Sequence, residues 1–431
     1  MINHILIIIY STVFIVSQIY LIKKNDILAL IWFFLTYIYS IFTILGYTFY
    51  TFVPKSIGIF SSKDTGTVLA TFVLNSYLLM FVVYCYLAKR RASLMYITLV
   101  SGCKMRRVFA FELFNTLLLT GLGAYFATNV DKFNWGAGSD SQGSSLFAFI
   151  FRYFIVVTLI QFIIVFEKLK QTIASKLLIF LDLSLVLLIS IKSGSRSDLL
   201  YLTISLLTYT FYDLSRIRKF DLMKLVAFAL LLFSLMQLML MTRHLPLDQI
   251  NISFLIDAFR ENIETFGIDE NSFMTSIILN DYFAPAATLA MSMDANIVIP
   301  YTVFVSNTSN SIYFVGYSLI SDFVVHEYGF SFLRGAGFAY FIFTEGFNVV
   351  GNLGVLYNGI IFGGILYCLR VITLQGNAFY TKAATSIVCL FVLSSIRGQS
   401  GIIAKMIIFH IIPAIITIYY ALGFQMYRVR K

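Results

Sequence analysis

Residues 67–91 read TVLATFVLNSYLLMFVVYCYLAKRR, an apolar run that ends at Lys89, Arg90 and Arg91. No charged residue precedes Lys89 in this run. A helix needs about 20 apolar residues to cross the hydrocarbon core of a bilayer, so the run is long enough to span a membrane. The basic cluster marks its inner end, because Lys and Arg are concentrated in cytoplasmic loops.

The same pattern repeats through the 431 residues of the chain. The composition agrees with it: 59% of the residues are hydrophobic, 12% are charged and the mean hydropathy is +0.86. Soluble proteins carry about 25% charged residues, which excludes a soluble enzyme and a disordered chain. The net charge of +10 is spread over short clusters, so nucleic-acid binding is not expected. The pattern predicts an all-α polytopic membrane protein with about eleven spans, at residues 4–22, 27–53, 67–88, 108–128, 147–166, 175–191, 197–213, 222–241, 352–369, 382–396 and 402–423.

The basic residues also predict the orientation of the chain. Lys23 and Lys24 follow the first apolar run, which is the reverse of a signal peptide, so this run is interpreted as a true span. If the N-terminus lies outside, every short inner loop is basic, and the odd number of spans places the C-terminus inside. The inner residues that support this are Lys23, Lys24, Lys89, Arg90, Arg91, Lys104, Arg106, Arg107, Lys168, Lys170, Lys176, Arg216, Arg218, Lys219, Lys224, Arg370, Lys382, Arg428, Arg430 and Lys431.

One long stretch interrupts the regular spacing of the spans. Between Thr242 and Gly335 there are ten acidic and three basic residues, with no clear span. A connection of this length is usually functional. It divides the chain into spans 1–8 (1–241), a large outer loop with amphipathic or re-entrant helices (242–336) and spans 9–11 (337–431). Two hidden crossings within the loop would leave the predicted orientation unchanged.

Four arginines are predicted at outer ends of spans: Arg196, Arg243, Arg334 and Arg397. Arg196 follows Ser193-Gly194-Ser195, whose backbone N–H groups suit an anion. Each arginine alone is explained as a lipid anchor. Together they predict a shared anion site, because a guanidinium group donates two parallel hydrogen bonds to a phosphate and stays charged.

Acidic and histidine residues supply the candidates for chemistry. Glu345 lies in an apolar stretch, where a carboxylate is costly unless it is paired or catalytic, and both roles are open. His326, at the end of an apolar part of the outer loop, is a second candidate base. Asp182 is predicted to be a hydrogen-bonded core residue, with proton coupling as the alternative. Glu112 is predicted close enough to the inner face to reach water.

The sequence contains no P-loop, no Gly-rich dinucleotide motif, no HExxH, no GxSxG and no DxD-type pair in a plausible metal position. The four cysteines form no ligand cluster. We therefore expect no metal and no cofactor, and chemistry that faces outward.

This organisation resembles the bacterial oligosaccharide repeat-unit polymerases of the O-antigen polymerase (Wzy) type. The large late outer loop is similar, and three short marks add to the resemblance. Ser193–Ser197 resembles the Gly-Ser-Arg turn that the family carries ahead of a span. Glu345-Gly-Phe-Asn348 with Gly351 and Gly354 resembles its Glu, aromatic and Asn followed by Gly-x-x-Gly. The third mark is Arg397-Gly398 between the last two spans.

The resemblance implies a GT-C-like glycosyltransferase in the bacterial inner membrane, with the N-terminus and the active site on the periplasmic side and the C-terminus in the cytoplasm. Its substrates would be oligosaccharides on undecaprenyl pyrophosphate, and it would move the growing glycan onto the non-reducing end of a lipid-linked repeat unit. Arg196, Arg243, Arg334 and Arg397 are then expected to bind pyrophosphate without a metal. Glu345 is expected to position the acceptor or to act as the base, and His326 is the second candidate for the base. The bilayer is a partner, and a chain-length regulator is a further candidate.

Two other functions stay open at this point. A ligase that transfers the finished glycan to lipid A core shares the chemistry. A flippase or other transporter of lipid-linked oligosaccharide predicts charges at several depths and internal repeats; the sequence has one deep acid, Asp182, and no repeat.

Overall fold

The computed structural model describes about half of the chain in detail, and all statements below concern those residues. They are 2–49, 63–89, 96–99, 105–129, 142–166, 172–193, 196–210, 212, 286–294, 296, 298–300, 302, 305, 341–374, 378–396, 403–404, 406–414, 416 and 424–427.

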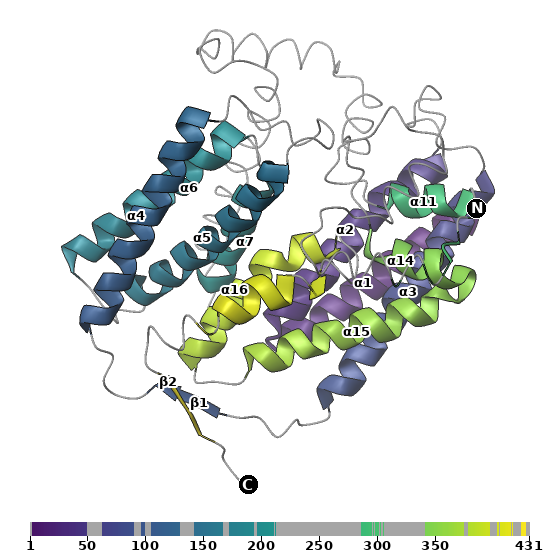
Figure 1. Ribbon diagram of the computed structural model, residues 1–431. Helices are drawn as coiled ribbons and strands as arrows, with labels where there is room; N and C mark the ends of the chain where they lie inside the picture. Colours follow the sequence, from purple (N-terminus) through teal and green to yellow (C-terminus); the bar gives the residue numbers. More distant parts are fainter. Residues whose placement is uncertain are drawn as a thin grey trace, which may run out of the picture. The chain divides into compact units, whose positions relative to one another are not determined.

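Apart from turns and a few irregular residues, the described residues are helical, with one two-stranded sheet (Figure 1). Five helical stretches are long and apolar enough to cross a membrane: Ile2–Lys23, Ile27–Leu45, Gly66–Lys89, Ile173–Ser190 and Ile342–Thr373. The predicted α-helical class and the presence of membrane-compatible helices are therefore confirmed, while the number of eleven spans stays a prediction.

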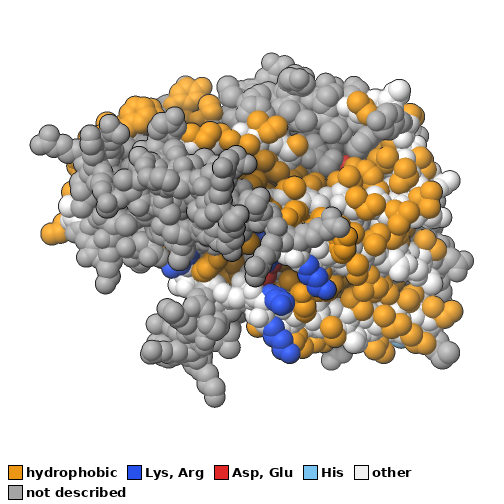
Figure 2. All heavy atoms as spheres, turned by 90° about the horizontal axis from the view of Figure 1, so that it is seen from below, with side chains coloured by type: hydrophobic (Ala, Val, Ile, Leu, Met, Phe, Trp, Pro, Cys, Tyr) orange, Lys and Arg blue, Asp and Glu red, His pale blue; other side chains and the backbone are white. Residues whose placement is uncertain are grey.

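Much of the described surface is apolar, which is compatible with a membrane protein. Figure 2 shows hydrophobic side chains over much of the described surface on the face it presents. Ile8 in the first helix is 66% exposed, and Phe180 in the sixth is 71% exposed. Soluble monomers rarely expose contiguous apolar surface of this kind, so these side chains are suited to lipid contact.

The chain forms two compact units. Unit 1 comprises Met1–Arg90, Leu247–Cys368 and Val392–Lys405, and unit 2 comprises Arg91–Pro246, Leu369–Phe391 and Met406–Lys431. Each unit is described by itself.

Unit 1 is built on three packed helices, α1 (Ile2–Lys23), α2 (Ile27–Phe49) and α3 (Lys63–Lys89). Hydroxyl groups join them inside an aromatic core. Tyr10 hydrogen-bonds Ser40 at 2.7 Å, and Ser17 hydrogen-bonds Tyr77 at 2.7 Å. The remaining elements of the unit are α11 (Ala287–Asp294), α14 (Ile342–Val350), the 3₁₀ turn η5 (Gly351–Leu353) and most of α15 (Gly354–Thr373).

The tight turn between α1 and α2 has a local cause. Asn25 adopts a φ of 51°, a left-handed conformation that Asn tolerates better than most residues. Asp26 then caps α2, because its Oδ1 accepts a hydrogen bond from the backbone N–H of Ala29 at 3.3 Å. The hydroxyl of Tyr84 donates to the other oxygen of Asp26, which ties the cap to α3.

Unit 2 contains α4 (Met105–Asn129), α5 (Gln142–Phe166), α6 (Ile173–Ser193), α7 (Arg196–Thr210), most of α16 (Ala378–Ile396) and the π-helical turn η6 (Ile407–Ile411). Ser205 of α7 donates to the backbone oxygen of Ser386 in α16 at 2.7 Å. The strands β1 (Tyr96–Leu99) and β2 (Phe424–Tyr427) pair antiparallel, with Tyr96 opposite Tyr427.

Nine of the predicted spans overlap a described helix, and their ends differ by a few residues. Span 222–241 lies outside the described residues, and span 402–423 is described only in part. The sequence did not predict α14 as a helix or the pairing of β1 with β2. The outer loop 242–336 lies mostly outside the described residues, apart from α11 and a few neighbours.

Candidate functional site

The apolar stretch Ile342–Thr373 is not one straight helix. α14 has nine residues and is about 13 Å long, which is too short to cross a bilayer. At Gly351 the backbone takes a φ of 61°, and the chain folds back as α15. The turn requires glycine, because other residues rarely adopt this conformation.

Glycine also allows the backbone of α14 to approach the first residue of α15 closely. A Cβ atom on Gly354 would lie 2.3 Å from the carbonyl carbon of Gly346, and one on Gly346 would lie 2.6 Å from the carbonyl oxygen of Gly354. Either distance is far below a van der Waals contact. The two helices therefore form a closed hairpin, called the α14–α15 hairpin below (Figure 1).

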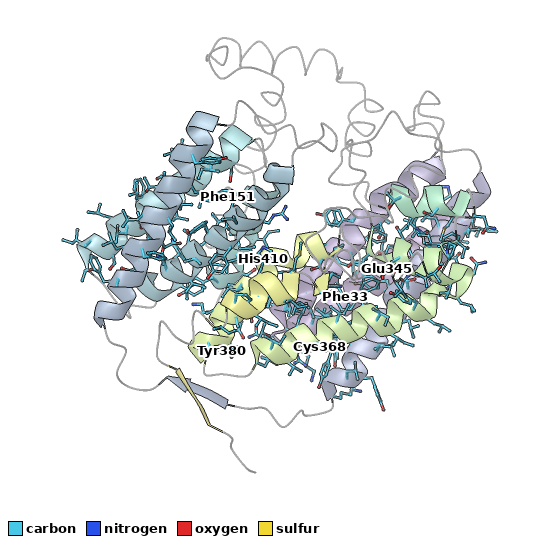
Figure 3. The ribbon with its side chains drawn as sticks, viewed as in Figure 1. Phe33, Phe151, Glu345, Cys368, Tyr380 and His410 are labelled. Atoms are coloured by element: carbon cyan, nitrogen blue, oxygen red, sulfur yellow. The ribbon has the colours of Figure 1, made fainter. Side chains whose placement is uncertain are left out.

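Glu345 lies inside this hairpin, and its side chain is fully buried (Figure 3). The hydroxyl of Tyr357, on α15, donates a hydrogen bond to Glu345 Oε1 at 2.5 Å. Glu345 is also in the first turn of α14, where the helix dipole favours a negative charge. The site thus holds a carboxylate in one fixed orientation.

Asn358 joins the hairpin to the rest of unit 1. Its amide nitrogen donates to Ser76 Oγ of α3 at 3.2 Å and to the backbone oxygen of Phe343 at 3.1 Å. Phe347, on α14, packs edge-on against Phe72 of α3, with ring centroids 5.8 Å apart. The hairpin is consequently held against α3 by both polar and aromatic contacts.

A polar face of α14 carries Thr344, Glu345 and Asn348, and α11 packs against this helix. The hydroxyls of Thr288 and Thr344 are 3.3 Å apart, and the backbone N–H of Ile299 donates to the backbone oxygen of Asn348 at 2.6 Å. The side-chain amide of Asn348 is fully buried, and both its atoms lack a partner in the described part of the chain. An amide that can donate and accept, one turn from a carboxylate, suits a hydroxyl-bearing ligand.

Of the six predicted site residues, the structure describes the side chain of Glu345 only. Arg196 is the first residue of α7, at the predicted turn-to-helix boundary, and its side chain is outside the described set. The other four, Arg243, His326, Arg334 and Arg397, lie outside the described residues. Glu345 belongs to unit 1 and Arg196 to unit 2.

The predictions for the two buried acids of unit 2, Asp182 and Glu112, have different outcomes. Asp182 is fully buried and accepts a hydrogen bond from Asn115 Nδ2 at 3.0 Å, which confirms it as a hydrogen-bonded core residue. The expectation that Glu112 reaches water is wrong. Its side chain is fully buried and accepts from Ser175 Oγ of α6 at 2.8 Å, because α6 packs over this part of α4.

Sequence reasoning missed Tyr357, Asn358 and Thr288. Tyr357 and Asn358 carried a usable signal, since they are adjacent polar residues inside an apolar helix that begins at Gly354. Thr288 had no such signal, because its role depends on the packing of α11 against α14.

Comparison of the chain with known proteins produced no match among family models, curated proteins or solved structures. Among the residues that the structure describes, no group of three or more His, Cys, Asp or Glu side chains is arranged to hold a metal ion.

Proposed function

We propose that this protein is a polymerase of a bacterial surface polysaccharide of the O-antigen type, in the inner membrane. It transfers a growing glycan from undecaprenyl pyrophosphate to the non-reducing end of a lipid-linked repeat unit. The observation that carries the proposal is the α14–α15 hairpin. The segment that resembles the family's Glu-to-Gly motif folds back on itself around a buried carboxylate. A helix that only crosses a membrane does not need this arrangement.

The chemistry of the reaction matches the predicted residues. The acceptor hydroxyl attacks the anomeric carbon, whose bond to the pyrophosphate oxygen breaks as the pyrophosphate leaves. The enzyme must stabilise the departing charge, orient the hydroxyl and accept its proton. Arg196, Arg243, Arg334 and Arg397 take the first role in place of a metal ion. Glu345 orients the hydroxyl or accepts its proton, with His326 as the reserve base.

The pairing of β1 with β2 agrees with the parity of the predicted spans. Two strands can pair only if they lie on the same side of the membrane. The chain between Leu99 and Phe424 must then cross an even number of times. Eight of the predicted spans lie in this interval, and the predicted topology places both strands in the cytoplasm.

The direct test supplies the purified protein in vesicles with lipid-linked repeat units alone. The wild type is expected to produce a ladder of glycan lengths. Glu345→Ala, Arg196→Ala and Arg397→Ala should each abolish the ladder at normal expression, and Arg→Lys should fail as well at a bidentate phosphate site. Arg152→Ala is the matched control, because this arginine lies on α5 and is not among the proposed pyrophosphate ligands. Full ladders from all three alanine variants would contradict the proposed site.

The same assay separates the ligase. A ligase produces nothing from repeat units alone and forms product only when lipid A core is added. The transporter is a second candidate, favoured by one observation: unit 2 holds two fully buried acids, Glu112 and Asp182. A transporter would move lipid-linked oligosaccharide across the vesicle membrane without forming a glycosidic bond.

A further inference from the structure

A buried polar cluster joins three helices of unit 2. Asn115 Nδ2, on α4, donates to Gln161 Oε1 of α5 at 3.2 Å and to Asp182 Oδ2 of α6 at 3.0 Å. Gln161 Nε2 donates to the backbone oxygen of Glu112 at 3.4 Å. These side chains are at most 3% exposed. Both amide nitrogens are engaged within the cluster, and the hydroxyl of Thr116 also interacts with the Asp182 carboxyl group.

Two oxygen atoms of this region have no hydrogen-bond partner in the described part of the chain. They are Asp182 Oδ1 and Thr158 Oγ1, both on fully buried residues. Thr158 precedes Gln161 by three residues, so the two side chains share one face of α5. A buried polar atom without a partner costs about 1–3 kcal/mol, and more when it carries charge.

We propose that this cluster binds a small monovalent cation, with the carboxylate of Asp182, the hydroxyl oxygen of Thr158 and the amide oxygen of Gln161 as ligands. All three are hard oxygen donors, the kind that alkali cations prefer. A cation between Asp182 Oδ1 and Thr158 Oγ1 would coordinate both oxygen atoms, and a proton on Asp182 is the alternative that the test below distinguishes. Asp182 offers one negative charge, which one positive charge balances.

The carboxyl group of Glu112 interacts electrostatically with that of Asp182, which disfavours two negative charges there unless a cation is bound. The site lies in unit 2, whereas the α14–α15 hairpin lies in unit 1. The cation site therefore does not depend on the proposed function and stands or fails separately from it.

The test measures thermal unfolding of the purified full-length protein in nanodiscs, in NaCl, KCl or choline chloride at equal ionic strength and constant pH. We expect the unfolding midpoint to rise by about 2 °C or more in Na⁺ or K⁺ over choline, with saturation. Asp182→Asn should remove the rise. Thr158→Val should raise the half-saturating concentration about tenfold. Thr120→Val is the matched control, because the Thr120 hydroxyl bonds only the carbonyl of Thr116 in its own helix, and it should keep the wild-type response.

Binding of ²²Na⁺ to the wild type by equilibrium dialysis gives a second measurement that does not depend on folded Asp182→Asn protein. One site per chain, displaced by unlabelled Na⁺, supports the proposal. Equal midpoints in all three salts together with no bound ²²Na⁺ overturn it. A midpoint that changes with pH but not with the cation also overturns it and assigns a proton to Asp182.

Discussion

Glu345 and Asp182 are both fully buried carboxyl groups in apolar helices, yet the structure holds them in different ways. Glu345 is in a nine-residue helix that folds back on its neighbour, and Tyr357 is its hydrogen-bond donor. Asp182 is in the middle of α6, a helix of 21 residues, and its partner is an amide from another long helix.

The difference lies in what sets the position of each group. In the α14–α15 hairpin the backbones touch at Gly346 and Gly354, so there is no room for adjustment. In unit 2, a Cβ atom on Gly123 of α4 would lie 3.5 Å from the side chain of Ile189 of α6, which is an ordinary contact. Asp182 is therefore positioned by side-chain hydrogen bonds and not by a backbone contact. A rigid backbone suits a group that must meet a substrate in one geometry, whereas side chains can rearrange around an exchanging ion.

The largest effect is expected at the backbone contact. Gly354→Ala places a methyl group inside the Gly346 backbone and should destabilise unit 1 by about 3 kcal/mol. Chemical unfolding of the purified protein measures the change. Gly364→Ala in the same helix is the control: its Cβ would meet nothing within 4 Å, so stability should hold or rise by up to about 1 kcal/mol. Equal midpoints for the two variants would show that the helices are not in contact.

The corresponding change in unit 2 should be smaller. Asn115→Leu removes the amide that donates to both Gln161 and Asp182, so the buried Asp182 carboxyl group loses one of its donors. We expect a loss of about 2 kcal/mol in unfolding free energy. Thr120→Val, one turn away, should change it by less than about 0.5 kcal/mol. A loss for Asn115→Leu no greater than that of the control would mean that the network does not hold the helices together.

The sequence predicted what depends on local patterns. Apolar runs located the helices, and Glu345 stood out because a carboxylate in an apolar stretch needs a reason. The hairpin could not be predicted, since the contact of Gly346 with Gly354 depends on a turn at Gly351 and not on periodicity. Similarly, Glu112 is buried because α6 packs over α4, and the hydropathy of α4 alone does not predict that packing.

A subtler effect is expected within the hairpin. Tyr357→Phe removes the hydroxyl that orients Glu345 while keeping the ring, and should cost about 1.5 kcal/mol in stability. If the proposed function holds, polymer formation should fall about tenfold. Tyr367→Phe, further along α15, is the control. In a double-mutant cycle, Tyr357→Phe should cost less in a Glu345→Gln background. Additive losses would indicate that Tyr357 acts through other contacts.

The smallest effect has the opposite sign. Asn348 buries an amide whose two polar atoms have no partner in the described residues, so Asn348→Leu should stabilise unit 1 by about 1 kcal/mol. Asn358→Leu is the matched control and should destabilise, because that amide donates to Ser76 and Phe343. Natural sites retain such a cost where function needs the group, so Asn348→Leu should also reduce polymer formation. If both leucine variants destabilise the protein alike, Asn348 has a structural partner, and the polar face of α14 is packing and not a site.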